Sequence, residues 1–563
     1  MQKILFSPIP MTEKCFLDEN IREKREYPRA SMLRGERFFF QLAYQYERPD
    51  IDRTVCTLTV EGDLAPYVTV RRVENVPVRT TTNQGCDDGN YLRTEPGLYP
   101  DLLRPMDPLC RVFVTRHLAA LWVEIRVPED APAGESALRF TLTGFDGSTD
   151  QSAVGKVLAA ADFTAQVIGA ALPPQEITVT QWFHADCLAS YYRVEIFSEE
   201  HWRIMENFIA TAVDNGIDMI LTPVFTPPLD TRIGAERPTV QLTDVTLRED
   251  GSWHFGFDRL RRWVQMCDRL GVRKFEISHL FTQWGARHAP KVMAHTPEGY
   301  RRVFGWDTDA TADEYRSFLC AFIPALVAEM EALGAGDRMA FHLSDEPGED
   351  HLANYISAKE CIKEALGGRP VMDALSNIAF FKTGAVETPV VSSDHIEAYL
   401  DAGVENLWTY YCCCQADGVS NRFLSMPTAR NRIIGSQFYK YNIAGFLQWG
   451  YNFYYTEGSV ELCDPYLCTD GNHWVPAGDA FSVYPAPDGT AYETIHLLGF
   501  TAALHDLRAF RLAESLCGRD AVMAVIEQQG EITFKDYPHS QEHVLGVRER
   551  INSMIARAIM ENE

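Results

Sequence analysis

The chain lacks an excess of positive charge. It has 52 Lys and Arg against 78 Asp and Glu, a formal net charge of −26 at pH 7. Nucleic-acid phosphates and anionic lipid surfaces bind basic faces, so we expect neither a nucleic-acid nor a membrane partner. The chain also lacks an apolar stretch of about 18 residues, the length that spans a bilayer. Its start, Met1–Pro8, shows no signal-peptide pattern, which predicts a cytoplasmic protein.

The 14 cysteines lack the paired spacing of a zinc site or a disulfide framework. Their one cluster is Cys412–Cys414. Successive side chains of a strand point to opposite faces, so on a strand these three thiols would not face one metal ion. We therefore expect reduced, mostly buried cysteines, and neither a metal nor another cofactor.

Aromatic residues are plentiful instead, at 11% with 10 Trp and 23 Tyr. Large cores use aromatic rings, but ring faces also stack on the apolar faces of sugars. The length of 563 residues exceeds what one compact core holds and predicts two or three domains.

Residues 1–172 are predicted to form a β-sandwich. Short β-branched or apolar runs alternate there with turn residues, which is typical of such domains. The predicted strands include Phe38–Tyr44, Thr54–Val60, Leu121–Val127 and Leu138–Thr143. Leu121–Val127 alternates in polarity, as a strand with one buried face does.

Residues 173–490 are predicted to form a (β/α)₈ barrel, because apolar strand-like runs alternate there with amphipathic helices. Ser198 is a predicted helix N-cap, Gly271 a predicted helix stop, and Thr311 with Glu314 a predicted capping box. Residues 491–563 are predicted to form helices that pack on the barrel. The eight predicted strands are Ile177–Phe183, Asp218–Val224, Lys274–Phe281, Arg338–Leu343, Val371–Leu375, Val390–Ser393, Val404–Tyr411 and Ile443–Trp449.

In such a barrel the working residues collect at the carboxyl ends of the strands. The fourth predicted strand leads into the adjacent acids Asp345 and Glu346, our candidate catalytic residues. Aromatic, amide and other polar side chains at the strand ends are candidates for binding substrate. These are Trp182, His184, Asp186, His279, Trp284, Asn377, Trp408, Tyr410, Trp449, Tyr451 and Asn452.

Two adjacent carboxyl groups do not easily flank a glycosidic bond, as the pair of an ordinary glycosidase does. They suit a route in which the 2-acetamido group of the substrate attacks the anomeric carbon. Glu346 would then protonate the leaving oxygen, and Asp345 would hold the amide N–H. Apolar surroundings raise a carboxyl pKa, which suits a general acid near neutral pH.

Several segments in this order resemble glycoside hydrolase family 123, whose described members are bacterial β-N-acetylgalactosaminidases. The segments are Val127–Gly134, Trp182–Asp186, His342–Pro347, Gly445–Asn452 and Gly478–Pro485. The resemblance implies an exo-acting, retaining, substrate-assisted enzyme without a metal. It places the acid/base at Glu346 and the acetamido-orienting residue at Asp345.

Three alternatives remain open. The sugar can be the O4 epimer, β-N-acetylglucosamine or another β-hexosaminide, with the same mechanism. The barrel can be a non-hydrolytic carbohydrate-binding protein, because fold alone does not fix function. Finally, His184, Asp186, Glu276 and His279 could converge as a metal-hydrolase site.

Overall fold

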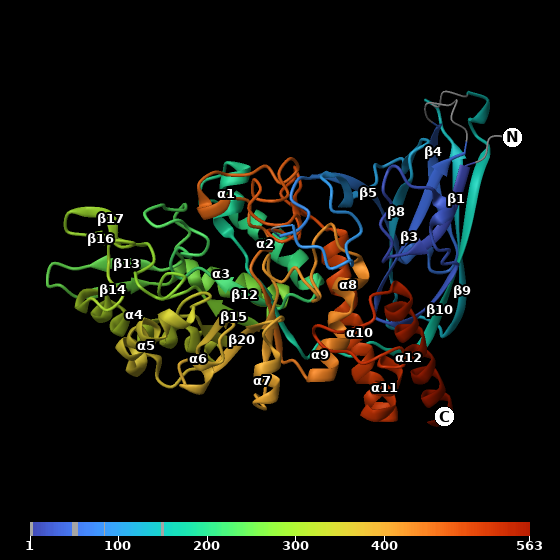
Figure 1. Cartoon of the computed structure of the whole chain (residues 1–563). Coiled ribbons are helices and arrows are strands. Elements are labelled where there is room, and N and C mark those ends of the chain that lie inside the picture. Colours follow the sequence, from blue (N-terminus) through green and yellow to red (C-terminus); the bar gives the residue numbers. More distant parts are fainter. Residues whose placement is uncertain (1–3, 48–53, 84, 148–150, 563) are drawn as a thin grey trace.

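The computed structural model describes residues 4–47, 54–83, 85–147 and 151–562. A strand-rich N-terminal region lies beside a C-terminal part built on a parallel, nearly closed barrel of eight strands (Figure 1). Within the described ranges, no helix has the length and apolar character needed to cross a bilayer.

The N-terminal region contains two five-stranded sheets. The first runs in the order β1 (Ile4–Pro10), β3 (Arg37–Tyr46), β8 (Ala119–Arg126), β5 (Val68–Val78) and β6 (Gly97–Pro105). The second runs β2 (Arg29–Arg34), β10 (Val157–Ala171), β9 (Gly134–Gly144), β4 (Thr54–Glu61) and β7 (Arg111–Val114). The rings of Phe40 on β3 and Phe163 on β10 stack with centroids 4.0 Å apart. The two sheets therefore face each other across a shared core.

The outer face of the first sheet is covered as well. Strand β8 alternates in polarity, yet six of its eight residues are buried. Trp122 of β8 packs with Ile495 and Leu498 of α10 (Ile495–Cys517). Glu124 of β8 lies in the same interface, where it pairs with Arg37 at 3.0 Å. One face of β8 packs in the core between the two sheets, and the other face packs against the C-terminal part. Both faces of the strand are therefore buried.

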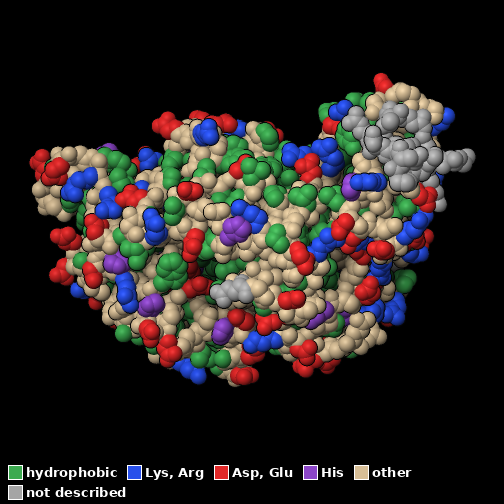
Figure 2. All heavy atoms as spheres, turned by 45° about the horizontal axis from the view of Figure 1, so that its top comes forward, with side chains coloured by type: hydrophobic (Ala, Val, Ile, Leu, Met, Phe, Trp, Pro, Cys, Tyr) green, Lys and Arg blue, Asp and Glu red, His purple; other side chains and the backbone are tan. Residues whose placement is uncertain are grey.

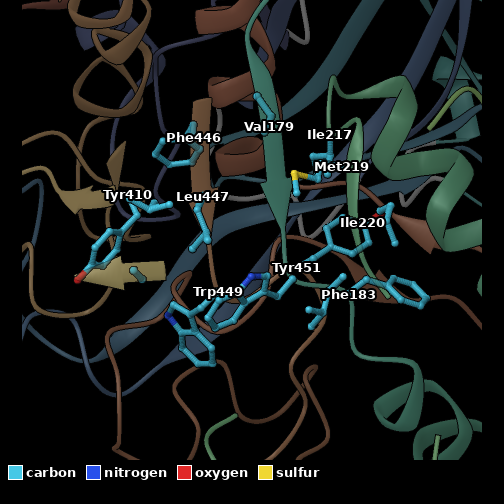
Figure 3. Packing of buried hydrophobic residues seen from close by; sticks show 14 of the residues in the cluster. Val179, Phe183, Ile217, Met219, Ile220, Tyr410, Phe446, Leu447, Trp449 and Tyr451 are labelled. Carbon is cyan, nitrogen blue, oxygen red and sulfur yellow. The ribbon is translucent and has the colours of Figure 1, made fainter. Parts of the chain in front are cut away.

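The barrel strands run in the order β18, β15, β12, β11, β22, β21, β20, β19, and all paired neighbours are parallel. A single bridge between Phe341 of β18 and Val371, next to β19, brings the two edge strands together. The bounds are β11 (Thr178–Gln181), β12 (Met219–Thr222), β15 (Lys274–Ile277), β18 (Met339–Phe341), β19 (Met372–Leu375), β20 (Thr388–Ser392), β21 (Trp408–Tyr410) and β22 (Gly445–Gln448). Each falls inside a strand predicted from the sequence, apart from the two-residue extension at the start of β20. Figure 3 shows apolar side chains from β11, β12, β21 and β22 packed together.

Within the described residues, helices connect most of the successive barrel strands, and three more helices come after the last strand in the chain. They are α1 (Ala185–Tyr192), α2 (Glu199–Asp214), α3 (Asp258–Leu270), α4 (Asp313–Ala332), α5 (Leu352–Leu366), α6 (Ala379–Lys382), α7 (Glu397–Asp401), α8 (Thr428–Arg432), α9 (Ile434–Tyr441), α10, α11 (Arg519–Ile526) and α12 (Gln541–Asn562). The start of α2 and the end of α3 are confirmed. The Ser198 side chain accepts the His201 N–H, and Gly271 adopts the left-handed conformation.

The predicted capping box of α4 is wrong. Ala312 is the N-cap, and its side chain accepts no hydrogen bond. The Thr311 hydroxyl instead donates to Asp309 at 2.6 Å, so it closes a turn before the helix.

A small four-stranded sheet was not predicted from the sequence. Its order is β14 (Trp253–Gly256), β13 (Asp244–Leu247), β16 (Val292–Thr296) and β17 (Gly299–Phe304). It projects from the segments that follow β12 and β15, at the end of the molecule far from the N-terminal sheets (Figure 1). A two-stranded ribbon, β23 (Tyr484–Pro485) and β24 (Ala491–Tyr492), precedes α10.

All 14 cysteines are free, and six of them are buried, fewer than we expected. The prediction for Cys412–Cys414 is also wrong. Strand β21 ends at Tyr410, and the three cysteines follow it in a turn rather than on the strand. Their sulfur atoms all lie within 4.8 Å of one another.

Candidate active site

A pocket opens at the carboxyl ends of the barrel strands, and Asp345 and Glu346 lie in its wall. They follow β18 after a short connection. The other lining residues come mainly from the ends of neighbouring strands and from a loop after β22. They are Trp182, Asp230, Ala374, Tyr410, Cys412, Cys413, Leu447, Trp449, Trp474 and Val475. Figure 3 shows Tyr410 and Leu447 on adjacent strands, with Trp449 beyond the end of β22.

Glu346 is held in a strained backbone conformation. Its φ is 41°, in the left-handed region that costs an ordinary residue roughly 1 kcal/mol or more. Its N–H donates to the Ala374 carbonyl at 3.1 Å, which ties this turn to the next strand, β19. The Tyr410 hydroxyl donates to Glu346 Oε1 at 2.6 Å. Burial raises the pKa of Glu346, and the Tyr410 hydrogen bond offsets part of that rise.

Asp345 is more deeply enclosed, with 9% of its surface exposed. Its pKa is raised well above the ordinary value, first by burial and then by the charges of Glu346 and Asp230. Its backbone carbonyl accepts a hydrogen bond from the backbone N–H of Trp284 at 2.9 Å. Because both carboxyl groups resist ionisation, the pair retains a proton at higher pH than two exposed carboxyls would.

A buried charged chain lies beneath the pair. His342 lies between Glu276, 2.6 Å from its Nε2, and Asp373, 2.8 Å from its Nδ1. Burial alone would lower the pKa of His342, but the hydrogen bonds to Asp373 and Glu276 raise it to about 10. The ring is therefore an imidazolium at neutral pH, and its positive charge opposes the rise in the pKa of Asp345.

Three of the predicted substrate-binding residues line this pocket: Trp182, Tyr410 and Trp449. The two indoles are fixed by their N–H groups. Trp182 donates to Glu276 at 2.7 Å, and Trp449 donates to Asp479 at 2.9 Å. Each indole N–H is thus bonded to a carboxyl group, Glu276 on β15 for Trp182 and Asp479 in the segment after β22 for Trp449.

Three other predicted residues form a buried support behind the pocket wall. Arg237 donates to both oxygens of Asp186, at 2.8 and 2.6 Å, and lies 3.1 Å from His184 Nδ1. Asn452 exchanges two hydrogen bonds with the backbone of His184. Burial and then the Arg237 charge lower the pKa of His184 to about 3, so the ring is neutral. These side chains are occupied by one another instead of lining the pocket.

The remaining predicted residues lie elsewhere. His279 is fully buried below the pocket, where its ring stacks on His342 with centroids 4.4 Å apart. Asn377 accepts the Ala379 N–H at the start of α6. Trp284 is 50% exposed and is not among the residues that line the pocket.

Two aromatic residues point to other parts of the barrel. Trp408 begins β21 rather than ending it, so it lies at the amino end of the strand beside Gly445. Tyr451 is fully buried and donates its hydroxyl to the Phe208 carbonyl on α2.

The metal-hydrolase alternative is contradicted by these contacts. His184 and Asp186 are engaged by Arg237, while Glu276 accepts from Thr180, Trp182 and His342. Within the described part of the chain, two other groups of side chains have ligand atoms close enough for a metal. One is Cys412–Cys414, and the other is His279, His342 and Asp373. In the second group the protonated His342 has no free lone pair to offer.

Sequence reasoning missed two parts of the wall. Asp230, from the segment after β12, lines the pocket. Burial raises its pKa to about 7, Arg237 opposes this rise, and Glu346 adds to it. Trp474 and Val475 come from the long loop after β22. The Pro227-Pro228 pair before Asp230 was the available signal, since prolines restrict the chain there and residues soon after a barrel strand build the site.

A larger cavity of about 420 Å³ lies at the opposite, amino end of β11 and β22. Its lining contains no aromatic ring and a single carboxyl group, Glu176. The chemistry of (β/α)-type barrels belongs to the carboxyl face, so the pocket around Asp345 is the better candidate.

Comparison with known proteins agrees with this geometry. Residues 182–513, more than half of the chain, match the family described as "Glycoside hydrolase 123, catalytic domain". The chain belongs to glycoside hydrolase family 123. It is therefore a glycosidase, and its substrate is a carbohydrate. No curated protein matches the sequence significantly.

The fold of this family 123 chain is shared with a solved relative. A family 123 glycoside hydrolase from Clostridium perfringens, described in terms of glycolipid glycan hydrolysis, superposes with a TM-score of 0.75. The two are 14% identical, and the match covers 100% of both chains. A putative β-galactosidase from Bacteroides fragilis is 9% identical, with a TM-score of 0.31 over 83% of this chain and 58% of the other.

The N-terminal region of this family 123 chain supports the pocket wall from outside the matched range. Asp470, in the loop that carries Trp474, accepts from Arg79 at 2.9 Å and from the Thr80 hydroxyl at 2.8 Å. Asp88 pairs with the buried Arg430 of α8 at 2.6 Å. In Figure 1 the loop from the first sheet reaches over the barrel top beside the segment after β22.

Proposed function

We propose that the chain is an exo-acting, retaining β-N-acetylgalactosaminidase that uses the acetamido group of its substrate as the nucleophile. The observation that carries the proposal is the placement of Asp345 and Glu346, adjacent in sequence, in one pocket with the rings of Trp182, Trp449 and Trp474. Indole faces stack on a pyranose ring, and two neighbouring carboxyl groups can serve an acetamido group and a leaving oxygen on the same side.

In the first step the acetamido carbonyl oxygen attacks the anomeric carbon, and the bond to the leaving oxygen breaks. Glu346 gives its proton to that oxygen. Its raised pKa keeps the proton available near neutral pH. The pair shares one proton, and with that proton on Glu346 the Asp345 carboxylate accepts the acetamido N–H and stabilises the positive charge of the oxazolinium ion that forms.

In the second step water attacks the anomeric carbon and reopens the oxazolinium ring. The Glu346 carboxylate takes a proton from this water and returns to its acid form. Two inversions at the anomeric carbon give net retention. Tyr410 stays hydrogen-bonded to Glu346 Oε1, so the other carboxyl oxygen carries out the transfer.

The galactosamine epimer and the glycolipid class are supported by the family and by the fold shared with the Clostridium perfringens enzyme. The walled form of the pocket favours the terminal sugar of a glycan, since the lining comes from several strand ends and from the loop at Trp474. The β-N-acetylglucosamine epimer differs only at O4 and is the alternative substrate for the same residues.

Asp230 supports a second candidate function. A third carboxyl in the wall of the pocket is what a conventional two-carboxylate glycosidase requires as nucleophile. In that case Asp230 would attack the anomeric carbon, Glu346 would remain the acid, and no acetamido group would be needed.

Wild type, Asp345→Asn, Glu346→Gln and Asp230→Asn can be assayed with aryl β-N-acetylgalactosaminide, β-N-acetylglucosaminide and β-galactoside. Our proposal predicts turnover of the acetamido sugars only, with about 10²-fold or greater losses in Asp345→Asn and Glu346→Gln. A stable thiazoline analogue of the oxazolinium ion should inhibit. Turnover of the β-galactoside, with a comparable loss in Asp230→Asn, would reject substrate assistance and establish the second candidate.

A further inference from the structure

The three adjacent thiols after β21 form a compact group at the pocket wall. The sulfur atoms of Cys412, Cys413 and Cys414 lie within 4.8 Å of one another, and those of Cys413 and Cys414 are 3.8 Å apart. Cys412 and Cys413 line the pocket together with Asp345 and Glu346. Three soft ligands therefore meet beside the catalytic candidates.

The turn that carries the thiols is held by its own hydrogen bonds. The Cys412 N–H donates to Gln415 Oε1 at 2.8 Å, and the Gln415 N–H donates to the Cys412 carbonyl at 3.2 Å. Asn421 Nδ2 donates to the carbonyls of Cys412 and Gln415, both at 2.8 Å. A turn fixed in this way presents the three sulfurs without a large ordering cost on binding.

The distances between the sulfur atoms and the chemical softness of thiolates indicate which metal ions can bind. Tetrahedral zinc has Zn–S bonds of about 2.3 Å, which corresponds to a sulfur–sulfur separation of about 3.8 Å. The sulfur atoms of Cys413 and Cys414 are 3.8 Å apart in the structure, which is the same separation. Thiolates favour thiophilic ions such as Zn²⁺ and Cd²⁺ and are poor ligands for Mg²⁺ and Ca²⁺.

The group can also reach solvent and lose its protons. Cys414 is exposed and Cys413 is half-buried, so an ion has a path to the sulfurs. The thiolate is the form that ligates a metal.

We propose that Cys412, Cys413 and Cys414 form a three-sulfur binding site for a thiophilic divalent cation of the zinc class, and that an ion bound there inhibits the enzyme. The ion replaces the thiol protons, which pass to the buffer, and a water completes its coordination. The inhibitory part rests on the proposed function. Cys412 and Cys413 line the same pocket as Glu346, so an ion held there with its bound water takes up space that the sugar needs beside Glu346.

The binding part can be tested spectroscopically without a substrate. Reduced, chelator-treated full-length protein is titrated with Cd²⁺, and the sulfur-to-cadmium charge-transfer absorption is followed. We expect a band that saturates at one ion per chain and is competed away by Zn²⁺. Cys414→Ser should weaken Zn²⁺ binding by more than about tenfold, since even changes around a ligand cost that much. Cys414 is exposed, so its replacement spares the core.

The matched control is the double variant Cys463→Ser/Cys468→Ser, which removes the other close pair, with sulfurs 3.5 Å apart. It should keep the band. A band that is absent in wild type, unaffected by Cys414→Ser or lost only in the control would overturn the site. For the inhibitory part, Zn²⁺ should reduce turnover of the aryl substrate in wild type at the concentration that saturates the site, and less so in Cys414→Ser. Binding without inhibition would refute regulation alone, and failure of all substrates would refute the proposed function while leaving the spectroscopic result intact.

Discussion

Tyr410 donates its hydroxyl to Glu346 Oε1 at 2.6 Å, across the barrel mouth from β21 to the turn after β18. The bond joins a side chain at a strand end to a glutamate whose backbone is already strained, with φ at 41°. It stabilises the carboxylate over the acid and thus sets how strong an acid Glu346 is.

Tyr410→Phe should move the alkaline limb of kcat/KM to higher pH. The lost hydrogen bond had lowered the pKa of Glu346, so without it that pKa rises and the acid form persists to higher pH. A hydrogen bond to a charged group contributes about 1.5–3 kcal/mol, so kcat/KM at neutral pH should fall about 10- to 150-fold. Profiles of rate against pH for both proteins give the shift.

Tyr411→Phe is the matched control. Tyr411 is the next residue and is equally buried, but its hydroxyl donates to Asn431 at 3.0 Å, away from Glu346. This variant should leave the alkaline limb where it is in wild type. An alkaline limb that stays fixed, or moves to lower pH, in Tyr410→Phe would contradict the assignment of Glu346 as the acid.

Asp230→Asn should move the acid limb of kcat/KM to lower pH if the reaction is substrate-assisted. The Asp230 charge raises the pKa of Asp345, so its removal lets Asp345 ionise at lower pH. We expect less than a tenfold loss in maximal rate. Asp244→Asn, on the small sheet with its side chain 46% exposed and paired with Arg259, serves as control. A loss of more than about 10³-fold with no shift would instead indicate that Asp230 is the nucleophile.

Asp470→Asn should raise KM more than it lowers kcat. Asp470 is fully buried and accepts from Arg79 and Thr80, which fixes the loop that carries Trp474. A loosened loop weakens stacking on the sugar, and we expect KM to rise about three- to tenfold, equivalent to roughly 1 kcal/mol. Asp464→Asn changes an exposed carboxyl of the same loop and should leave KM unchanged. Equal losses in both variants would show that the contact with Arg79 and Thr80 is not what positions Trp474.

Glu493→Gln should lower stability at neutral pH. Burial would raise the pKa of Glu493, but Arg37 and Arg71 outweigh it and lower that pKa to about 2. A depressed carboxyl pKa stabilises the fold above the unfolded value of about 4.3, and this contribution is lost as pH falls toward 2. The shift corresponds to about 3 kcal/mol. Thermal melts should therefore show a clear loss at pH 7 that shrinks below pH 4.

Glu206→Gln is the control for this stability measurement. Glu206 pairs with Arg269 at 3.3 Å, but its side chain is 42% exposed, and such pairs contribute little. Its melting temperature should stay close to that of wild type at every pH. A loss in Glu493→Gln that is the same at about pH 2.5 and at pH 7 would contradict a charge-based contribution.

Local signals in the sequence were enough to predict the positions of the barrel strands and of several helix ends. Ser198 and Gly271 mark helix ends through bonds to their own backbone neighbours, so their roles do not depend on the rest of the fold. Strand positions followed from apolar runs between such ends. The small sheet was missed because its strands are mostly only partly buried and lack the continuous apolar runs of the barrel strands, although Asp250-Gly251 between β13 and β14 is a hairpin turn signal.

The site was harder to predict because its members depend on register and on distant segments. Trp408 and Tyr410 are two residues apart, yet β21 places one at its start and the other at the pocket. In the sequence, His184 and Asp186 have the spacing of metal or substrate ligands. In the structure both contact Arg237, which is about 50 residues away in the chain. The thiols of Cys412–Cys414 converge because the strand ends before them, a boundary that apolar periodicity does not fix.

The surface around the barrel mouth is mixed in charge. In the view of Figure 2, which brings the top of Figure 1 forward, acidic and basic side chains are interspersed over this face. A neutral glycan can approach such a face without strong repulsion, despite the net charge of −26.

Two sets of hydrogen bonds should constrain how the sequences of family 123 relatives change over time. Arg79 and Thr80 donate to Asp470, and Arg430 donates to Asp88. The family match begins at residue 182, but these bonds tie the pocket loops to Arg79, Thr80 and Asp88. A recombination breakpoint at the start of the match would separate partners that need each other. We expect the two segments to covary among relatives and to be inherited as one unit.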